Sequence, residues 1–122
     1  MEVQCNIDEP ADRCIRTPTC RFRGWIAITP HSGGQELKFL HFKIGQLNVP
    51  HVLTSRPDVE GAFPNHASSG FQIRFDLTYY MQYVVNDHLA IYAMLPQFEP
   101  FRLDFTIDKG VVGLCLAAAA GA

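Results

Sequence analysis

The sequence predicts an all-β protein, namely an antiparallel β-sandwich of about seven or eight strands with an immunoglobulin-like arrangement. Three observations support this prediction. Several segments alternate apolar and polar residues with a period of two, which places one face of a strand in a core. Turn-forming residues separate these segments at short, nearly regular intervals, without long helical periodicity between them. The 122 residues suffice for one domain of this kind.

The strongest alternation in the first half of the chain covers residues 20–28. Phe22 and Ile26 fall on one face of this segment, and Arg21 and Trp25 fall on the other. The residues before it alternate briefly and then contain two prolines, as a loop does. We therefore expect strands over residues 3–7, 20–28, 36–44 and 47–49, a loop over 10–19 and a turn over 29–34.

The middle of the chain interrupts the alternation. Pro57 suits the first turn of a short helix, where the carboxylates of Asp58 and Glu60 lie near the positive end, and Pro64 ends it. The cleanest alternation in the sequence follows from Phe71. We expect a polar loop over 65–70, strands over 71–77, 89–95 and 101–107, and either a helical connection or a strand over 79–85.

The C-terminal region is expected to complete the sheet. Residues 108–110 have the composition of a tight connection, so residues 111–116 are predicted to pair with 101–107 as a hairpin. Residues 117–122 show no core pattern. We therefore assign residues 1–116 to one β-sandwich domain and 117–122 to a linker or a truncated tail.

Composition narrows the classes of function. The net charge of −2, from 10 basic and 12 acidic residues, gives no field that would hold a nucleic acid. Nine Phe, four Tyr and one Trp exclude a disordered chain. The N-terminus lacks the basic start and apolar run of a signal peptide, and the longest apolar stretch is half of a membrane span. We expect a cytoplasmic protein without a membrane span.

The cysteines and histidines show no metal-ligand spacing. The four cysteines form no CxxC pair, and no two histidines are three or four residues apart. We expect reduced cysteines, with Cys20 and Cys115 acting as small core hydrophobes. Neighbouring strands could still bring His41 and His88 together. The sequence therefore predicts no metal and no cofactor.

Catalytic motifs are also missing from the sequence. Ser68-Ser69-Gly70-Phe71 lacks the preceding glycine of a nucleophile elbow, and Ser32-Gly33-Gly34 is not followed by the lysine of a phosphate-binding loop. Carboxylates such as Asp76 and Asp104 alternate outward on strands, as on a solvated face. We assign no catalytic residue, and a small enzyme that uses Cys or His is the least favoured class of function.

Trp25, Arg56 and Asp58 are the candidate binding residues. Trp25 could offer a flat face on which a sugar ring stacks, but we favour a core tryptophan of the sandwich. Arg56 and Asp58 could contact a ligand or a partner. We favour a local clamp, in which Asp58 caps backbone donors and Arg56 holds a carbonyl or carboxylate of a loop.

Several short motifs, taken in order, resemble one family. The chain looks like the small β-sandwich module at the N-terminal side of bacterial glycosyltransferases and some sugar-pathway methyltransferases, which build surface polysaccharide. The resemblance covers about residues 7 to 108, and the apolar segment 79–85 departs from the family pattern. The motifs are Ile7-Asp8-Glu9-Pro10, Arg23-Gly24-Trp25, Arg56-Pro57-Asp58-Val59 with Phe63-Pro64, and Ser69-Gly70-Phe71.

This resemblance implies a module without catalytic residues of its own. Its expected role is that of an accessory domain of a glycosyltransferase-like protein, which binds carbohydrate or positions the adjacent catalytic domain. The alternative is a structural module that mediates protein interaction or homodimerisation without a ligand. Exposed sheet edges and the apolar segment 37–42 would provide the contacts in that case.

Overall fold

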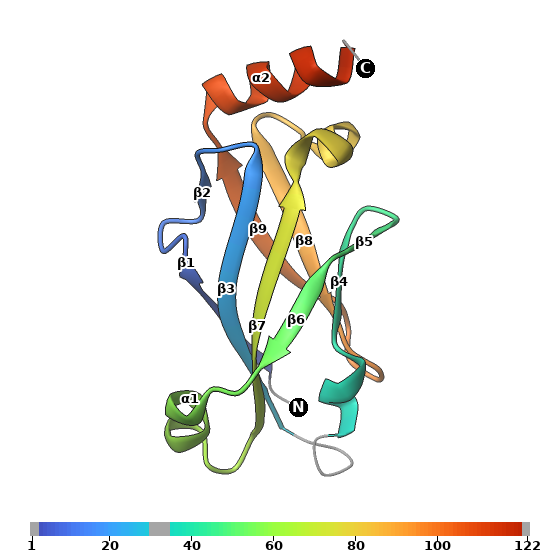
Figure 1. Cartoon of the computed structure of the whole chain (residues 1–122). Coiled ribbons are helices and arrows are strands. Elements are labelled where there is room, and N and C mark those ends of the chain that lie inside the picture. The colour runs from blue at the N-terminus through green and yellow to red at the C-terminus, as the bar shows by residue number, and fades with distance from the viewer. Residues whose placement is uncertain (1–2, 30–34, 121–122) are drawn as a thin grey trace.

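The computed structural model describes residues 3–29 and 35–120, and strands make up most of its regular structure (Figure 1). Four antiparallel strands form one sheet, in the order β1-β3-β7-β6. Five strands form a second sheet, in the order β2-β9-β8-β4-β5, in which only β2 and β9 are parallel. The strands are β1 (Val3–Glu9), β2 (Cys14–Ile15), β3 (Thr19–Ile28), β4 (His41–Ile44), β5 (Leu47–Val49), β6 (His51–Thr54), β7 (Ala67–Asp76), β8 (His88–Met94) and β9 (Phe101–Ile107).

The all-β prediction is confirmed by these two sheets, and the described residues contain nine strands where seven or eight were expected. The alternation that predicted β3, β7, β8 and β9 corresponds to the observed burial along each strand. The parallel pairing of β2 with β9 departs from the expected antiparallel arrangement. Two residues are too few to produce a visible alternation, so the sequence pattern did not reveal β2.

Aromatic side chains join the two sheets. The ring of Phe22 on β3 stacks on that of Phe105 on β9, with centroids 4.3 Å apart and planes 5° from parallel. Phe42 on β4 lies against Phe71 on β7 at 4.7 Å. These residues belong to one buried cluster that receives apolar side chains from both sheets. Cys20 and Cys115 are buried members of this cluster, as predicted.

The C-terminal hairpin prediction is wrong, because residues 109–120 form the helix α2 (Lys109–Ala120). The Asp108 carboxylate accepts a hydrogen bond from the backbone N–H of Gly110 at 2.9 Å and so caps the first turn. Val111 and Cys115, four residues apart, are both buried on one side of the helix. The predicted tail is therefore helical as far as Ala120, because alanine is the best helix former.

The strand predicted over residues 36–44 is shorter than expected. The 3₁₀-helix η1 (Gln35–Phe39) precedes β4. Leu37 and Leu40 are both buried and lie three residues apart, which is the period of a 3₁₀ turn, whereas Phe39 is 65% exposed. The turn predicted over 29–34 lies outside the described residues except for Thr29.

The segments around β6 and β7 also differ in part from the prediction. The expected short helix is α1 (Pro57–Ala62), with Pro57 in its first turn. The loop predicted over 65–70 is wrong from Ala67 onward, because Ser68 and Ser69 pair with β3 and extend β7. The edge strand β6 had no alternation to reveal it. The ambiguous segment forms the 3₁₀-helix η2 (Leu77–Tyr83), which the Asp76 side chain caps.

Candidate functional site

The family-like motifs converge on the outer face of the four-stranded sheet. Arg56 follows β6 and begins the turn into α1, and its side chain reaches back toward β1. Its Nε and Nη2 donate to the two carboxylate oxygens of Asp58 at 3.0 and 2.8 Å, and its Nη1 donates to Asp8 at 2.6 Å. One guanidinium therefore ties the strand β1 to the start of α1.

The glycines of two motifs stand where other atoms approach closely, and Gly70 leaves space for the Arg56 side chain. A Cβ atom on Gly70 would lie 2.4 Å from both the Cγ of Arg56 and the Oγ1 of Thr54. A Cβ atom on Gly24 would lie 2.3 Å from the backbone oxygen of Asn6. The glycines of the two motifs are thus explained by close approach of side chain and backbone, without reference to a ligand.

Trp25 does not lie in the core between the sheets, so the favoured core interpretation is wrong. It is half-buried on the outer face of the four-stranded sheet, where its ring lies 5.3 Å from that of Phe63. In the register of β3 and β7, Trp25 is opposite Gly70, which offers no side chain to cover the indole. The position keeps part of the indole accessible beside the Arg56 clamp.

The hydrogen bonds of Arg56 have the geometry of a local clamp. The hydrogen bonds from Arg56 lower the pKa of Asp58 to about 2, and those to Asp58 and Asp8 raise the pKa of Arg56 itself. The Arg56 and Asp8 side chains are only 22% and 26% exposed. The N-cap residue of α1 is Arg56, which makes no side-chain cap hydrogen bond, and backbone N–H groups of Asp58 and Val59 contribute to the lowered pKa of the Asp58 carboxyl. Sequence reasoning found Arg56 and Asp58 but missed Asp8, which lies 48 residues from Arg56.

The histidines and cysteines do not assemble into a site within the described residues. His41 pairs with Met94, and His88 begins the same strand β8, so the two histidines lie at opposite ends of that strand. Burial raises the pKa of Cys5 and of Cys20 to about 12, which keeps both thiols protonated near neutral pH. In the part of the chain that the structure describes, no group of three or more metal-ligating side chains comes together.

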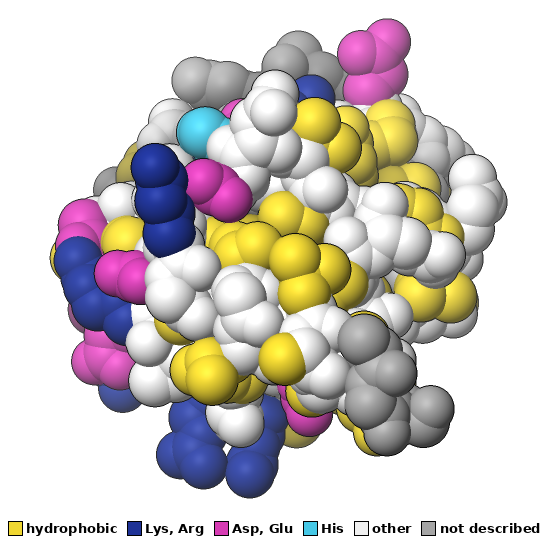
Figure 2. Space-filling view, turned by 90° about the horizontal axis from the view of Figure 1, so that it is seen from above, with side chains coloured by type: hydrophobic (Ala, Val, Ile, Leu, Met, Phe, Trp, Pro, Cys, Tyr) yellow, Lys and Arg dark blue, Asp and Glu magenta, His cyan; other side chains and the backbone are white. Residues whose placement is uncertain are grey.

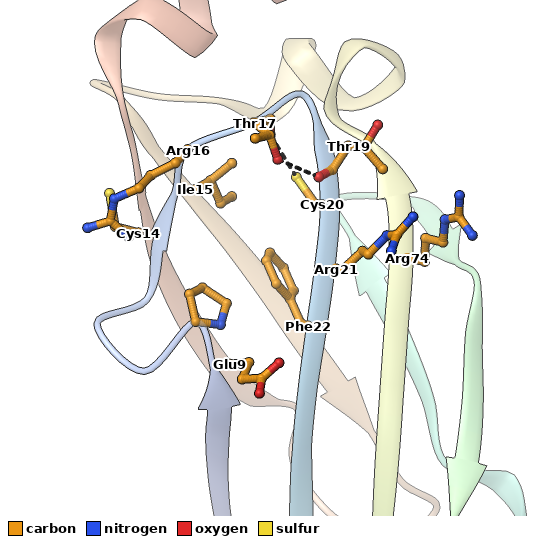
Figure 3. A pocket seen from close by; sticks show the side chains of 11 residues that line it. Glu9, Cys14, Ile15, Arg16, Thr17, Thr19, Cys20, Arg21, Phe22 and Arg74 are labelled. Carbon is orange, nitrogen blue, oxygen red and sulfur yellow. Dashed lines mark hydrogen bonds between the residues drawn. The ribbon is translucent and has the colours of Figure 1, made fainter.

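A groove of about 570 Å³ opens where β1 leaves the four-stranded sheet (Figure 3). The pairing of β1 with β3 ends at Glu9 and Arg23, so residues 19–22 of β3 have no strand on that side. The buried side chains of Ile15 and Phe22 form its floor. Its rim is polar and basic, and is formed by Glu9, Arg16, Thr17, Thr19, Arg21 and Arg74.

Arg21 and Arg74 meet at the rim of this groove. They are directly opposite each other in the register of β3 and β7, and Figure 3 shows their guanidinium groups side by side. Each strand alone gives only an alternating polar position, so the pair becomes visible only when the register is known. Sequence reasoning therefore missed it.

The α2 end of the molecule presents an apolar surface. Figure 2 looks down on this end and shows hydrophobic side chains gathered across it. Leu114 and Leu116 of α2 are 63% and 54% exposed, and Tyr79 on η2 and Val85 after it are also exposed. No helix in the described residues is long and apolar enough to span a membrane.

Comparisons with protein-family models, with curated proteins and with solved structures gave no match to this chain.

Proposed function

We propose that the chain is a non-catalytic accessory module of a glycosyltransferase-like protein and that it positions the catalytic domain through its α2 end. The observation that carries this proposal is the composition of α2, whose only charged residue is Lys109. A helix that is apolar on all sides is ordinarily buried on all sides. Val111 and Cys115 are buried against the module, whereas Leu114 and Leu116 face outward.

The partner surface that would complete this packing is apolar with a polar rim. Tyr79 and Val85 extend the exposed apolar area beyond α2, which is the composition expected at the centre of an interface. The motif order that resembles the accessory modules of glycosyltransferases is the reason for naming a catalytic domain as the occupant. The four free cysteines support a cytoplasmic location within the same proposal.

Site-specific photocrosslinking tests this function. A photoreactive phenylalanine analogue replaces Leu116, and a matched control places it at Glu60 on α1, at the far end of the molecule (Figure 1). We expect crosslinks from position 116 to map onto a glycosyltransferase-like catalytic domain, and none from position 60. Crosslinks from position 116 that map only onto a second copy of this chain would replace the proposal with homodimerisation.

Carbohydrate binding is the second candidate function, and the partly exposed Trp25 favours it. Exposed polar side chains, including Asn6 and Gln72, lie on the same face and could bond to sugar hydroxyls. Trp25 is the single tryptophan of the chain, so its intrinsic fluorescence reports directly on this face. Titration with surface-polysaccharide fragments is expected to change that fluorescence saturably, and flat titrations across the fragments would exclude this function.

We further propose that the two sheets form an immunoglobulin-like β-sandwich. The order β1-β3-β7-β6 corresponds to strands A, B, E and D of that fold, and β9-β8-β4-β5 corresponds to G, F and C with an added C′. Two departures are that all four cysteines are free and that the tryptophan lies on the B-like strand. The buried Phe42 takes the core position on the C-like strand.

A further inference from the structure

The groove contains a stretch of β3 that has no neighbouring strand on one side. Pairing of β3 with β1 ends at Arg23, because the chain leaves β1 in a turn, where the N–H of Arg13 donates to the carbonyl of Pro10 at 3.0 Å. Thr19 and Arg21 lie beyond this point and are exposed. Residues 19–22 therefore pair with β7 alone, and the groove of about 570 Å³ lies along their other side (Figure 3).

The register shows which backbone groups face the groove. The N–H of Leu77 donates to the carbonyl of Pro18 at 2.9 Å, and these two residues continue the register of β3 with β7. In an antiparallel ladder, successive residues of a strand direct their N–H and C=O groups alternately to its two sides. Because Pro18 bonds toward β7, Thr19 and Arg21 direct their backbone groups toward the groove.

Most of these backbone groups lack a protein partner among the described residues. The carbonyl of Thr19 accepts a hydrogen bond from the Thr17 hydroxyl at 2.8 Å. The N–H of Thr19 and both backbone groups of Arg21 form no hydrogen bond to another described residue on this edge. Such a row of free donors and acceptors is what an added strand pairs with.

The β1 strand indicates which side chain suits a neighbour of Arg21. Glu9 is opposite Arg23 in the register, and its carboxylate accepts a hydrogen bond from that guanidinium at 3.2 Å. Arg21, two residues along the same edge, forms no ion pair with the described residues. Asp76 lies on the same face of the sheet but is opposite Thr19 and caps η2. A carboxylate placed opposite Arg21 would therefore repeat the pair of Glu9 and Arg23.

From this geometry we propose that the groove binds an extended acidic peptide segment of a partner protein, which adds to β3 as an antiparallel strand. A glutamate opposite Arg21 exchanges two backbone hydrogen bonds with it and places a carboxylate beside its guanidinium. The peptide residues on either side face inward, toward Cys20 and Phe22. Because these two side chains are already almost fully buried, the inward-facing peptide side chains are small, and the pairing depends on the backbone. The proposal uses no residue of α2 or of the Trp25 face, so it stands independently of the proposed function.

The test is an NMR titration of the 122-residue chain with the capped tetrapeptide acetyl-Ala-Glu-Ala-Thr-amide. In antiparallel pairing, the first peptide residue lies opposite Phe22 and the last lies opposite Thr19. We expect saturable downfield shifts of the amide protons of Thr19 and Arg21, because both gain a hydrogen bond. A peptide with an N-methyl group on the glutamate keeps the charge but loses the donor to the Arg21 carbonyl, so its affinity is expected to fall at least about fivefold.

A second comparison separates the charge from the backbone. Glutamine in place of the peptide glutamate is expected to weaken binding about two- to fivefold, because an exposed ion pair contributes little. Arg21→Gln is expected to cause the same loss for the glutamate peptide and no further loss for the glutamine peptide. The matched control is Arg102→Gln, which changes an exposed arginine paired with Asp104 on β9 and is expected to leave the binding of both peptides unchanged.

Several outcomes would overturn the proposal. The absence of saturable shifts would exclude the site, and equal binding of the N-methylated peptide would exclude strand pairing. An equal loss in Arg102→Gln would reduce the binding to general surface charge. Shifts centred on Val52 and Leu53 would place the peptide on the free edge of β6 instead of in the groove. Shifts of the Thr19 and Arg21 amides that follow protein concentration without peptide would replace the partner protein with a second copy of this chain.

Discussion

The Arg56 side chain connects segments that are far apart in the sequence. It reaches over Gly70 on β7 and ends between Asp8 on β1 and Asp58 at the start of α1. A partly buried carboxylate such as that of Asp8 needs a charged partner, because water reaches it only in part. The conformation of the chain after β6 therefore depends on this one guanidinium.

Loss of the Arg56 side chain should destabilise the fold. Arg56→Ala is expected to lower the free energy of unfolding by about 1–3 kcal/mol, because Asp8 is left half-buried without its charged donor. Arg56→Lys should recover part of the loss, since lysine keeps the charge but not the forked donors. Urea denaturation measures both. Arg102→Ala is the control, and an equal loss there would show that Arg56 acts only as a surface charge.

The ion pair of Asp58 with Arg56 makes the stability of the fold depend on pH. The pKa of Asp58 is lowered to about 2 in the folded chain, against about 4 in an unfolded one. A lowered pKa adds stability above the unfolded value, and that stability is lost as the pH falls through the folded value. The difference in unfolding free energy between the parent chain and Asp58→Asn should therefore shrink between about pH 4 and about pH 2. The same measurement on Asp104→Asn, which changes an exposed carboxylate of β9, is the control. A difference for Asp58→Asn that stays constant over this pH range would contradict the clamp.

Sequence reasoning reached only part of this chemistry. The spacing of Arg56 and Asp58 is local, so a clamp between them could be predicted. The contribution of Asp8 and the pairing of Arg21 with Arg74 both depend on which strands are neighbours and in what register. A slip of one residue reverses the face of every side chain on a strand, so such pairs need coordinates.

At the scale of elements, α2 and η1 show where periodicity misleads. An apolar run with two buried residues, Val111 and Cys115, satisfies a buried strand and a helix equally well when it is short. The alternating strands β3, β7, β8 and β9 were predictable because one face of each is buried and the other is wet. Short elements such as β2 and β6 owe their form to pairing with their neighbours, which the sequence does not record.

A pair of substitutions at Gly113 tests the helical assignment of this segment. A Cβ atom there meets no atom within 4 Å, so packing does not decide the outcome. In a helix, Gly113→Ala should raise the unfolding free energy by about 0.5–1 kcal/mol, and Gly113→Val should raise it less. In a strand, valine would be the better residue. Gly61→Ala in α1 is the matched control. If urea denaturation gives Gly113→Val a higher unfolding free energy than Gly113→Ala, the helical assignment of this segment is wrong.

At the scale of the whole molecule, the stability depends on contact between the two sheets. β1 and β2 follow each other in the chain but belong to different sheets, and β5 and β6 are separated only by Pro50 yet also divide between them. The chain therefore crosses from one sheet to the other at both edges. Neither sheet can bury its apolar face without the other, so we expect one cooperative unfolding transition.

A double-mutant cycle on Phe22 and Phe105 tests this coupling. Their rings stack at 4.3 Å across the two sheets, so Phe22→Leu and Phe105→Leu should show a coupling of about 0.5–1.5 kcal/mol in urea denaturation. Val59→Ala changes a buried residue of α1, outside the cluster between the sheets, and should combine with Phe105→Leu additively within about 0.5 kcal/mol. Additive losses for the phenylalanine pair would mean that the two sheets do not stack through these rings, and the proposed sandwich would then have to be abandoned.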